Sequence, residues 1–283
     1  MFNKHPKGLI AAALANLGER FGFYTMMAIL VLFLQAKFGM NGKEAGFIYS
    51  TFYFSIYILA LVGGIIADKT RNYKGTIFTG IVLMAVGYLL LAIPSKTPVD
   101  NKMLYLVITC ASLFVIAFGN GLFKGNLQAL VGQMYDNPQY ANMRDSGFSL
   151  FYMFINIGAI FAPFAAVGVR NWWLSTFGYN YDADLPALCH GQLAGTLSPE
   201  ATETYHTLVT KASTAPVQDY TAFASDYLNV FTTGFHYAFG VAIIAMAISL
   251  TIYWLNKKNF PDPSKKTVAS SASSTVVEMS AQE

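Results

Sequence analysis

Long apolar stretches separated by short polar segments dominate this chain. The six stretches cover residues 8–35, 46–67, 76–93, 103–133, 147–169 and 235–255. Each has about 18 residues or more, enough for an α-helix to cross roughly 30 Å of hydrocarbon. The short segments between them carry the glycine, proline and asparagine residues typical of turns. The pattern predicts an all-α membrane protein, with a six-helix transmembrane bundle in residues 1–258.

The composition supports lipid as the solvent for this chain. Of its 283 residues, 54% are hydrophobic and 12% are charged, whereas about a quarter of the residues in a soluble domain are charged. A net charge of +3 is too small to indicate a nucleic-acid partner. Cys110 lies in an apolar stretch and Cys189 in a polar one, so they form neither a disulfide framework nor a metal site. We expect a lipid bilayer as surroundings, with no cofactor and no metal.

Basic residues between the stretches predict the orientation, because lysine and arginine near helix ends stay on the cytoplasmic side. Segments on the side of the N-terminus contain more of them: Lys4, Lys7, Lys69, Arg71, Lys74, Arg144, Lys257, Lys258, Lys265 and Lys266. Segments on the other side contain fewer: Lys37, Lys43, Lys96, Lys102, Arg170 and Lys211. We expect a multi-pass protein of the cell (inner) membrane with a cytoplasmic N-terminus.

Two polar regions lie outside this simple pattern. Residues 170–233 form the one long connection, which is rich in acidic residues and has Trp172 and Trp173 at its edge. On the predicted topology it is extracytoplasmic, and it is either a solvated, partly ordered loop or a small cap. Residues 259–283 end in a serine-rich segment that is typical of a disordered linker, here on the cytoplasmic side.

Three charged residues lie inside the apolar stretches: Glu19, Arg20 and Lys124. An ionised side chain at mid-bilayer costs roughly 2.5–3.5 kcal/mol on insertion scales, so such residues are usually paired or line a wet cavity. Asn16 and Glu19 share one face of the first helix, with Arg20 beside it, which predicts an inward polar stripe. A functional role is the favoured interpretation, and a structural ion-pair network is the alternative.

Other positions at helical spacing gain interest from these charges. Tyr49, Tyr53 and Tyr57 form a stripe on the second helix, for which, taken alone, packing or interhelical hydrogen bonding is the favoured explanation. On the fourth helix, the small residues of the row Gly121, Gly125 and Ala129 are expected to permit close helix contact beside Lys124.

On the fifth helix, Asn156 shares a face with Ser149 and Tyr152, and Pro163 would let the helix bend. Asp68 and Lys69, at the end of the second helix, are expected to clamp the following loop and to influence gating.

Four ordered segments resemble the motifs of one family. Glu19-Arg20-Phe21-Gly22-Phe23-Tyr24 resembles the end of E-x-x-E-R-F-x-Y-Y, and Gly63-Gly64-Ile65-Ile66-Ala67-Asp68-Lys69 is similar to G-G-x-x-A-D-R. The segments Gly119–Asn126 and Phe151–Pro163 resemble G-x-G-x-x-K-P-N and F-Y-x-x-I-N-x-G-S-x-x-x-P. These are motifs of the proton-dependent oligopeptide transporters, a branch of the major facilitator superfamily. The resemblance runs from about Gly8 to Pro263.

The resemblance implies a fold, an activity and a set of site residues. The chain would be the N-terminal six-helix half of a major facilitator fold, acting with a missing C-terminal six-helix half as a proton-coupled di- and tripeptide symporter by alternating access. Its partners would be small peptides and protons. The implied proton-coupling residues are Glu19, Arg20 and Lys124. The implied substrate-binding residues are Arg20, Tyr24, Tyr57, Lys124 and Asn156, and the implied gating or structural residues are Asp68, Lys69 and Pro163.

Departures from the motifs keep other functions open. Asn16 stands where the first motif has a glutamate, so the usual pair of titrating carboxylates is incomplete. Phe23, Met27, Gly125 and Ala159 depart from the motifs or from residues found in some members. The alternatives are a transporter of another small solute and a truncated, non-transporting binding or assembly module. An enzyme is not expected, because the stretches contain no nucleophile–base set or metal-ligand spacing.

Overall fold

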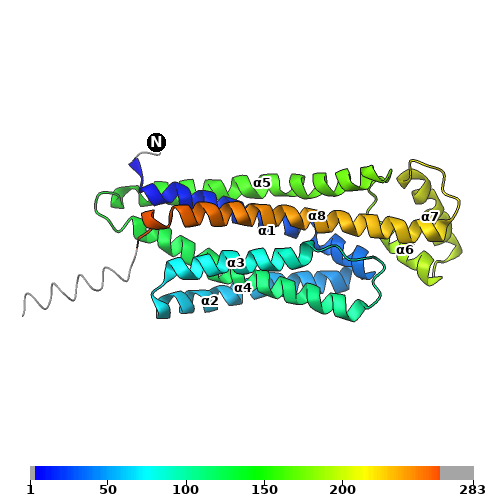
Figure 1. Cartoon of the computed structure of the whole chain (residues 1–283), viewed down its shortest axis with the longest axis horizontal. Coiled ribbons are helices and arrows are strands. Elements are labelled where there is room, and N and C mark those ends of the chain that lie inside the picture. Colours follow the sequence, from blue (N-terminus) through cyan, green and yellow to red (C-terminus); the bar gives the residue numbers. More distant parts are fainter. Residues whose placement is uncertain (1–3, 262–283) are drawn as a thin grey trace, which may run out of the picture.

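Six long helices run side by side in the structure, a computed structural model that describes residues 4–261 (Figure 1). They are α1 (Lys7–Phe38), α2 (Gly42–Thr70), α3 (Tyr73–Ala92), α4 (Lys102–Met134), α5 (Arg144–Thr176) and α8 (Tyr220–Leu255). All six are long and apolar enough to cross a membrane. The predicted six-helix bundle is therefore confirmed, and the chain is a multi-pass membrane protein.

The bundle consists of two groups of three helices. Helix α1 packs against α5 and α8, and α5 packs against α8, while α4 packs against both α2 and α3. The groups meet where α3 contacts α8 and where α1 contacts α2 and α4. Figure 1 shows the two groups one above the other. Helix α1 thus lies between the groups, and Glu19 and Arg20 in its middle are buried in the interior.

Polar residues at the helix ends satisfy backbone groups that lack partners within the helix. Asn41 caps α2 and forms a capping box with Glu44: its Oδ1 accepts from the Glu44 amide at 3.0 Å, and Glu44 accepts in return from the Asn41 amide. The side chain of Asn72 caps α3 at 2.9 Å, and that of Asn101 caps α4 at 3.0 Å. Gly39 ends α1 in the left-handed conformation, with φ of 59°. The turn residues noted in the sequence therefore define the helix ends.

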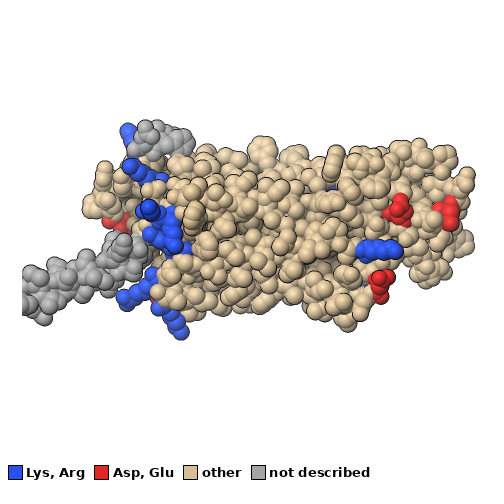
Figure 2. All heavy atoms as spheres, viewed as in Figure 1, with Lys and Arg blue, Asp and Glu red and all other residues tan. Residues whose placement is uncertain are grey.

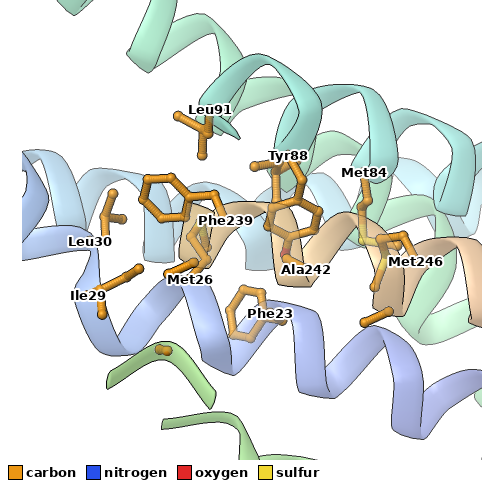
Figure 3. Close-up of a cluster of buried hydrophobic side chains, with 14 of the residues drawn as sticks. Phe23, Met26, Ile29, Leu30, Met84, Tyr88, Leu91, Phe239, Ala242 and Met246 are labelled. Atoms are coloured by element: carbon orange, nitrogen blue, oxygen red, sulfur yellow. The ribbon is translucent and has the colours of Figure 1, made fainter. Parts of the chain in front are cut away.

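The centre of the bundle is filled by large apolar side chains from three helices (Figure 3). Met26 of α1, Tyr88 of α3, and Phe239 and Met246 of α8 have no exposed surface, and Phe23 of α1 is 4% exposed. Lipid tails are as apolar as these side chains, so transfer out of water does not hold the helices together. Close packing and interhelical hydrogen bonds must stabilise the bundle instead.

Glycines bring the backbones of α2, α3 and α4 into contact. A Cβ at Gly119 of α4 would lie 2.7 Å from the carbonyl oxygen of Gly80 in α3, and one at Gly121 would collide with the backbone of α2 at Leu59. The prediction that Gly121, Gly125 and Ala129 together permit close helix contact is wrong for two of the three residues. Nothing lies within 4 Å of a Cβ placed at Gly125, and Ala129 is exposed, so the helix contact uses Gly119 and Gly121 instead.

The long polar connection is folded. Helix α5 continues to Thr176 and α8 begins at Tyr220; between them lie α6 (Leu185–Ala194) and α7 (Pro199–Ala212). Helix α6 packs against α7 and α8, and the Tyr205 hydroxyl donates to the Tyr220 carbonyl at 2.6 Å. Residues 177–219 therefore form a helical cap on one end of the bundle, the second of the two alternatives considered from the sequence. The predicted linker at 259–283 falls mostly outside the described residues, and a short 3₁₀ helix, η3, covers Lys257–Asn259.

Candidate functional site

A buried ion pair lies at the centre of α1. Arg20 donates to both carboxylate oxygens of Glu19, through Nε to Oε2 and through Nη2 to Oε1, the latter at 2.7 Å. Glu19 has no exposed surface and Arg20 is 5% exposed, with its guanidinium carbon 4.9 Å from the Phe23 ring centroid. Neighbouring residues on a helix do not normally face each other. Both side chains therefore bend toward one another in a site that water does not reach.

Asn120 connects this ion pair to α4. Its Nδ2 donates to Oε1 of Glu19 at 2.8 Å, and the side chain has no exposed surface. The Oδ1 atom of Asn120 has no hydrogen-bond partner among residues 4–261. The hydroxyl of Tyr88, which lies near Glu19 and Arg20, also has none there. The carboxylate of Glu19 thus accepts three hydrogen bonds, two from α1 and one from α4. A change in the charge of Glu19 would therefore act directly on both helices.

Lys124 belongs to a second, more open cluster. It lies one turn along α4 from Asn120, and its Nζ is 5.5 Å from the ring centroid of Tyr57, within cation–π range. Tyr57 donates to the hydroxyl of Tyr53 at 3.1 Å, and Tyr53 stacks on Tyr49, so the predicted stripe on α2 exists as a set of ring contacts. Lys124 makes no hydrogen bond or ion pair with any other described side chain. The structure therefore brings Glu19 and Arg20 together but leaves Lys124 outside their network.

Tyr24 lies between the two clusters. Its ring contacts that of Phe23, with centroids 5.4 Å apart, and it is within electrostatic range of both Arg20 and Tyr53. Asn156 is exposed on α5 and makes no hydrogen bond with the other described residues. Two positions further along α5, a Cβ at Gly158 would lie 2.8 Å from a backbone oxygen of α1. Because residues two apart point to nearly opposite sides of a helix, Asn156 points away from this contact with α1.

The remaining predicted residues lie away from the ion pair. Asp68, at the end of α2, accepts a hydrogen bond from the hydroxyl of Tyr73, the first residue of α3, and Lys69 is exposed. This contact spans the short connection between the two helices. Pro163 lies inside α5, and the preceding carbonyl, that of Ala162, accepts from Thr25 of α1 at 3.5 Å.

Sequence reasoning missed two buried cations because it placed them in loops. Lys37 lies in the last turn of α1 and is 2% exposed, and it donates to Oγ1 of Thr97 at 2.8 Å and to the carbonyls of two neighbouring residues. Arg170 lies within α5 and is 3% exposed, with its guanidinium carbon 3.6 Å above the Tyr181 ring. Both lie within two residues of an expected stretch, so extending each helix by a turn would have placed them correctly.

Burial also changes the ionisation of residues in the cap. Burial raises the pKa of the Cys189 thiol to about 12. Burial also lowers the pKa of His190, although its hydrogen bond with the Ala36 carbonyl, 2.8 Å from Nε2, acts in the opposite direction. No group of three or more His, Cys, Asp or Glu side chains that could hold a metal ion occurs in the described part of the chain.

Known proteins share both the sequence and the fold of this chain. Residues 74–282 match the sequence model of the POT family. Peptide transporter YePEPT of Yersinia enterocolitica subsp. palearctica serotype O:3 (strain YE-P4) is 34% identical over 185 residues, which are 64% of this chain and 34% of the relative. Dipeptide and tripeptide permease A of Enterobacter sp. (strain 638) is 34% identical over 179 residues, or 62% of this chain and 32% of the relative.

A crystal structure of a POT peptide transporter in complex with sulfate has the same arrangement of helices. It superposes with a TM-score of 0.59 at 25% identity, and the match covers 98% of this chain and 45% of that structure. The chain thus spans about a third of the length of the curated relatives and under half of the solved structure. The predicted fold class, a six-helix bundle corresponding to half of a major facilitator fold, is confirmed.

Proposed function

Because the chain belongs to the POT family, we propose that it forms one half of a proton-coupled di- and tripeptide symporter that works by alternating access. The observation that carries this proposal is the buried pair of Glu19 and Arg20, hydrogen-bonded to α4 through Asn120. Charges inside a membrane are costly and commonly mark substrate or proton pathways. The names of two relatives, a peptide transporter and a dipeptide and tripeptide permease, support small peptides as the substrate class.

Glu19 is the proposed proton carrier. While it is ionised, it occupies the Nε and Nη2 donors of Arg20 and the amide of Asn120. Protonation would remove the negative charge and with it most of the attraction that holds the guanidinium. Arg20 would then be free to bind the carboxylate of a peptide, so that uptake of the proton and of the peptide are coupled. Glu19 is the one acidic side chain of α1, and Asn16, at the position of the first motif glutamate, cannot titrate. Glu19 is therefore the only residue of α1 proposed to carry this proton.

The open cluster supplies the proposed substrate contacts. Lys124 presents a cation with no carboxylate partner in residues 4–261, beside Tyr57, which is 52% exposed. We assign Tyr24 and Asn156 to the same substrate site, where they would bind a carboxylate and peptide amides. We propose that a second six-helix bundle covers this face in the working transporter, and that substrate binds between the two halves.

The remaining site residues have proposed roles in movement. The contact of Asp68 with Tyr73, next to Lys69, would hold the α2–α3 connection, and Pro163 would let α5 bend during opening. The concentration of lysine and arginine at one end of the bundle supports a cytoplasmic position for that end, in the inner membrane.

Dialanine uptake tests the proposal. Proteoliposomes that contain the complete two-bundle transporter should accumulate radiolabelled dialanine when an inward proton gradient is applied. Glu19→Gln should abolish accumulation driven by the gradient and retain exchange of dialanine, whereas Glu203→Gln, the same change at an exposed position on α7, should behave as the unaltered protein. Gradient-driven accumulation by Glu19→Gln would remove Glu19 from proton coupling, and the absence of any dialanine uptake would redirect the proposal to another solute.

The open face also gives a prediction for the isolated bundle. Because Lys124 and Tyr57 face no opposing helix within the described residues, a peptide bound there would contact protein on one side only. Vesicles that contain this chain alone should therefore take up no dialanine. Uptake by such vesicles would overturn the proposed need for a second bundle.

A further inference from the structure

A basic hollow lies at the end of the bundle where α3 begins and α8 ends. It has a volume of about 710 Å³ and is lined by Lys74, Trp254, Leu255, Lys257 and Lys258. Figure 2 shows lysine and arginine side chains gathered at this end of the molecule, whereas acidic side chains are concentrated toward the opposite end. Three of the five residues that line the hollow are lysines, so its polar lining is basic.

Packing fixes the position of these lysines. The hydroxyl of Tyr253 donates to the carbonyl of Lys74 at 3.1 Å and so ties the last turn of α8 to the first turn of α3. The Tyr253 ring stacks on Phe260, with centroids 5.0 Å apart, and Phe260 is 3% exposed. A Cβ at Gly8 would lie 2.8 Å from the carbonyl oxygen of Asn259, so the chain after α8 is folded back onto α1. Lys257 and Lys258, in the turn between these contacts, are thus held at a fixed place.

The apolar wall of the hollow indicates what kind of anion it binds. Trp254 is 62% exposed and Leu255 is 66% exposed, and both lie at the end of a membrane-spanning helix. Tryptophan concentrates where hydrocarbon meets headgroups. A small free anion would use only the lysines, whereas a phospholipid would use the lysines for its phosphate and Trp254 and Leu255 for its acyl chains.

We propose that this hollow binds an anionic phospholipid. Its phosphate lies against Lys257 and Lys258 at the edge lined also by Lys74, and its acyl chains run along Trp254 and Leu255. Basic pockets at the ends of membrane helices bind anionic headgroups in this way. The proposal goes beyond the transport function, because it depends only on the position of this end at the membrane surface.

Quenching of Trp254 by brominated lipid tests the site directly. In the full chain with Trp172→Phe and Trp173→Phe, Trp254 is the only tryptophan. The fluorescence of this protein in vesicles should be quenched more strongly by brominated phosphatidylglycerol than by brominated phosphatidylcholine, with a relative binding constant at least fivefold higher. Lys257→Gln/Lys258→Gln should remove this preference, because each lysine near the surface contributes about fivefold, which corresponds to ~1 kcal/mol.

Lys4→Gln/Lys7→Gln is the matched control, since it removes two exposed cations from the same end outside the hollow. It should keep the preference for phosphatidylglycerol. Equal quenching by the two lipids, or equal loss of preference in both double variants, would overturn the proposal. So would displacement of the brominated lipid by inorganic phosphate, which would indicate a site for the free anion.

If the tryptophan-substituted background does not fold, native mass spectrometry of the chain with its tryptophans intact, titrated with phosphatidylglycerol, provides the second measurement. Loss of one bound lipid in Lys257→Gln/Lys258→Gln, and in that variant only, supports the site. Unchanged lipid binding by this variant refutes it.

Discussion

Replacing Glu19 by glutamine should destabilise the bundle far more than replacing an exposed glutamate. The carboxylate has no exposed surface and accepts from Arg20 twice and from Asn120 once. Glutamine keeps one acceptor oxygen but loses the charge, so the guanidinium of Arg20, 5% exposed, is left without its counter-ion. Removing one partner of a buried ion pair typically costs about 3–5 kcal/mol. We expect a loss of this size in the free energy of unfolding.

A double variant separates the loss of the pair from the loss of packing. In Glu19→Gln/Arg20→Gln no uncompensated charge remains in the interior, so the main cost of the single substitution is absent. The double variant should therefore be more stable than Glu19→Gln alone. Unfolding of each purified chain by increasing SDS in mixed detergent micelles, followed by circular dichroism, gives the free energies, with Glu203→Gln as the exposed control.

Two results would refute the reasoning. If Glu19→Gln loses no more than the control, about 0.5 kcal/mol or less, then the pair is not buried as described. Arg20→Gln, measured alone, completes the cycle. If the double variant loses the sum of the losses of Glu19→Gln and Arg20→Gln, the two side chains are not energetically coupled, because a buried pair must give a non-additive cycle.

Three further predictions concern helix packing and the cap. Gly121→Leu should lower the free energy of unfolding by about 1–3 kcal/mol in the same assay, because its side chain would overlap the backbone of α2. Gly125→Leu should change it little, and equal effects of the two substitutions would contradict the described contact. The folded-state pKa of His190 is lowered, so its contribution to stability should be complete above the unfolded value of 6.5 and should fall as the pH drops below it. In His190→Gln, the free energy of unfolding should therefore change less between pH 7 and pH 5 than in the unaltered protein. An identical pH dependence in the two proteins would argue against this role. In the Cys110→Ser protein, Cys189, buried and with its pKa raised to about 12, should resist N-ethylmaleimide at pH 7.5 until the chain is unfolded, and rapid labelling of the folded protein would show that the cap opens.

The helices and the central charges could be predicted from the sequence because each rests on a strong local signal. A run of apolar residues long enough to span a bilayer permits few structures other than a helix. The positions of Glu19 and Arg20 within such a run already require burial or pairing. The stripe of Tyr49, Tyr53 and Tyr57 follows directly from the helical period.

Contacts between helices could not be predicted, because they depend on how the helices rotate and approach. Asn120 shares a row with Lys124, yet only the packed bundle shows that it reaches Glu19 while Lys124 turns to Tyr57. Gly125 and Gly121 have the same residue type, and only Gly121 touches another helix. Lys37 was misplaced because hydropathy falls off before the helix ends, and a cation satisfied by backbone carbonyls leaves no mark in the sequence.

The glycine contacts of α4 have a mechanical consequence. Gly119 meets α3 and Gly121 meets α2 with backbone against backbone, so no layer of side chains can change rotamer to let one helix slide past the next. Helices α2, α3 and α4 are thereby joined into one rigid unit. A large rearrangement of the bundle would then move this unit as a rigid body, and so move Asn120 toward or away from the Glu19 carboxylate on α1 to which it is hydrogen-bonded.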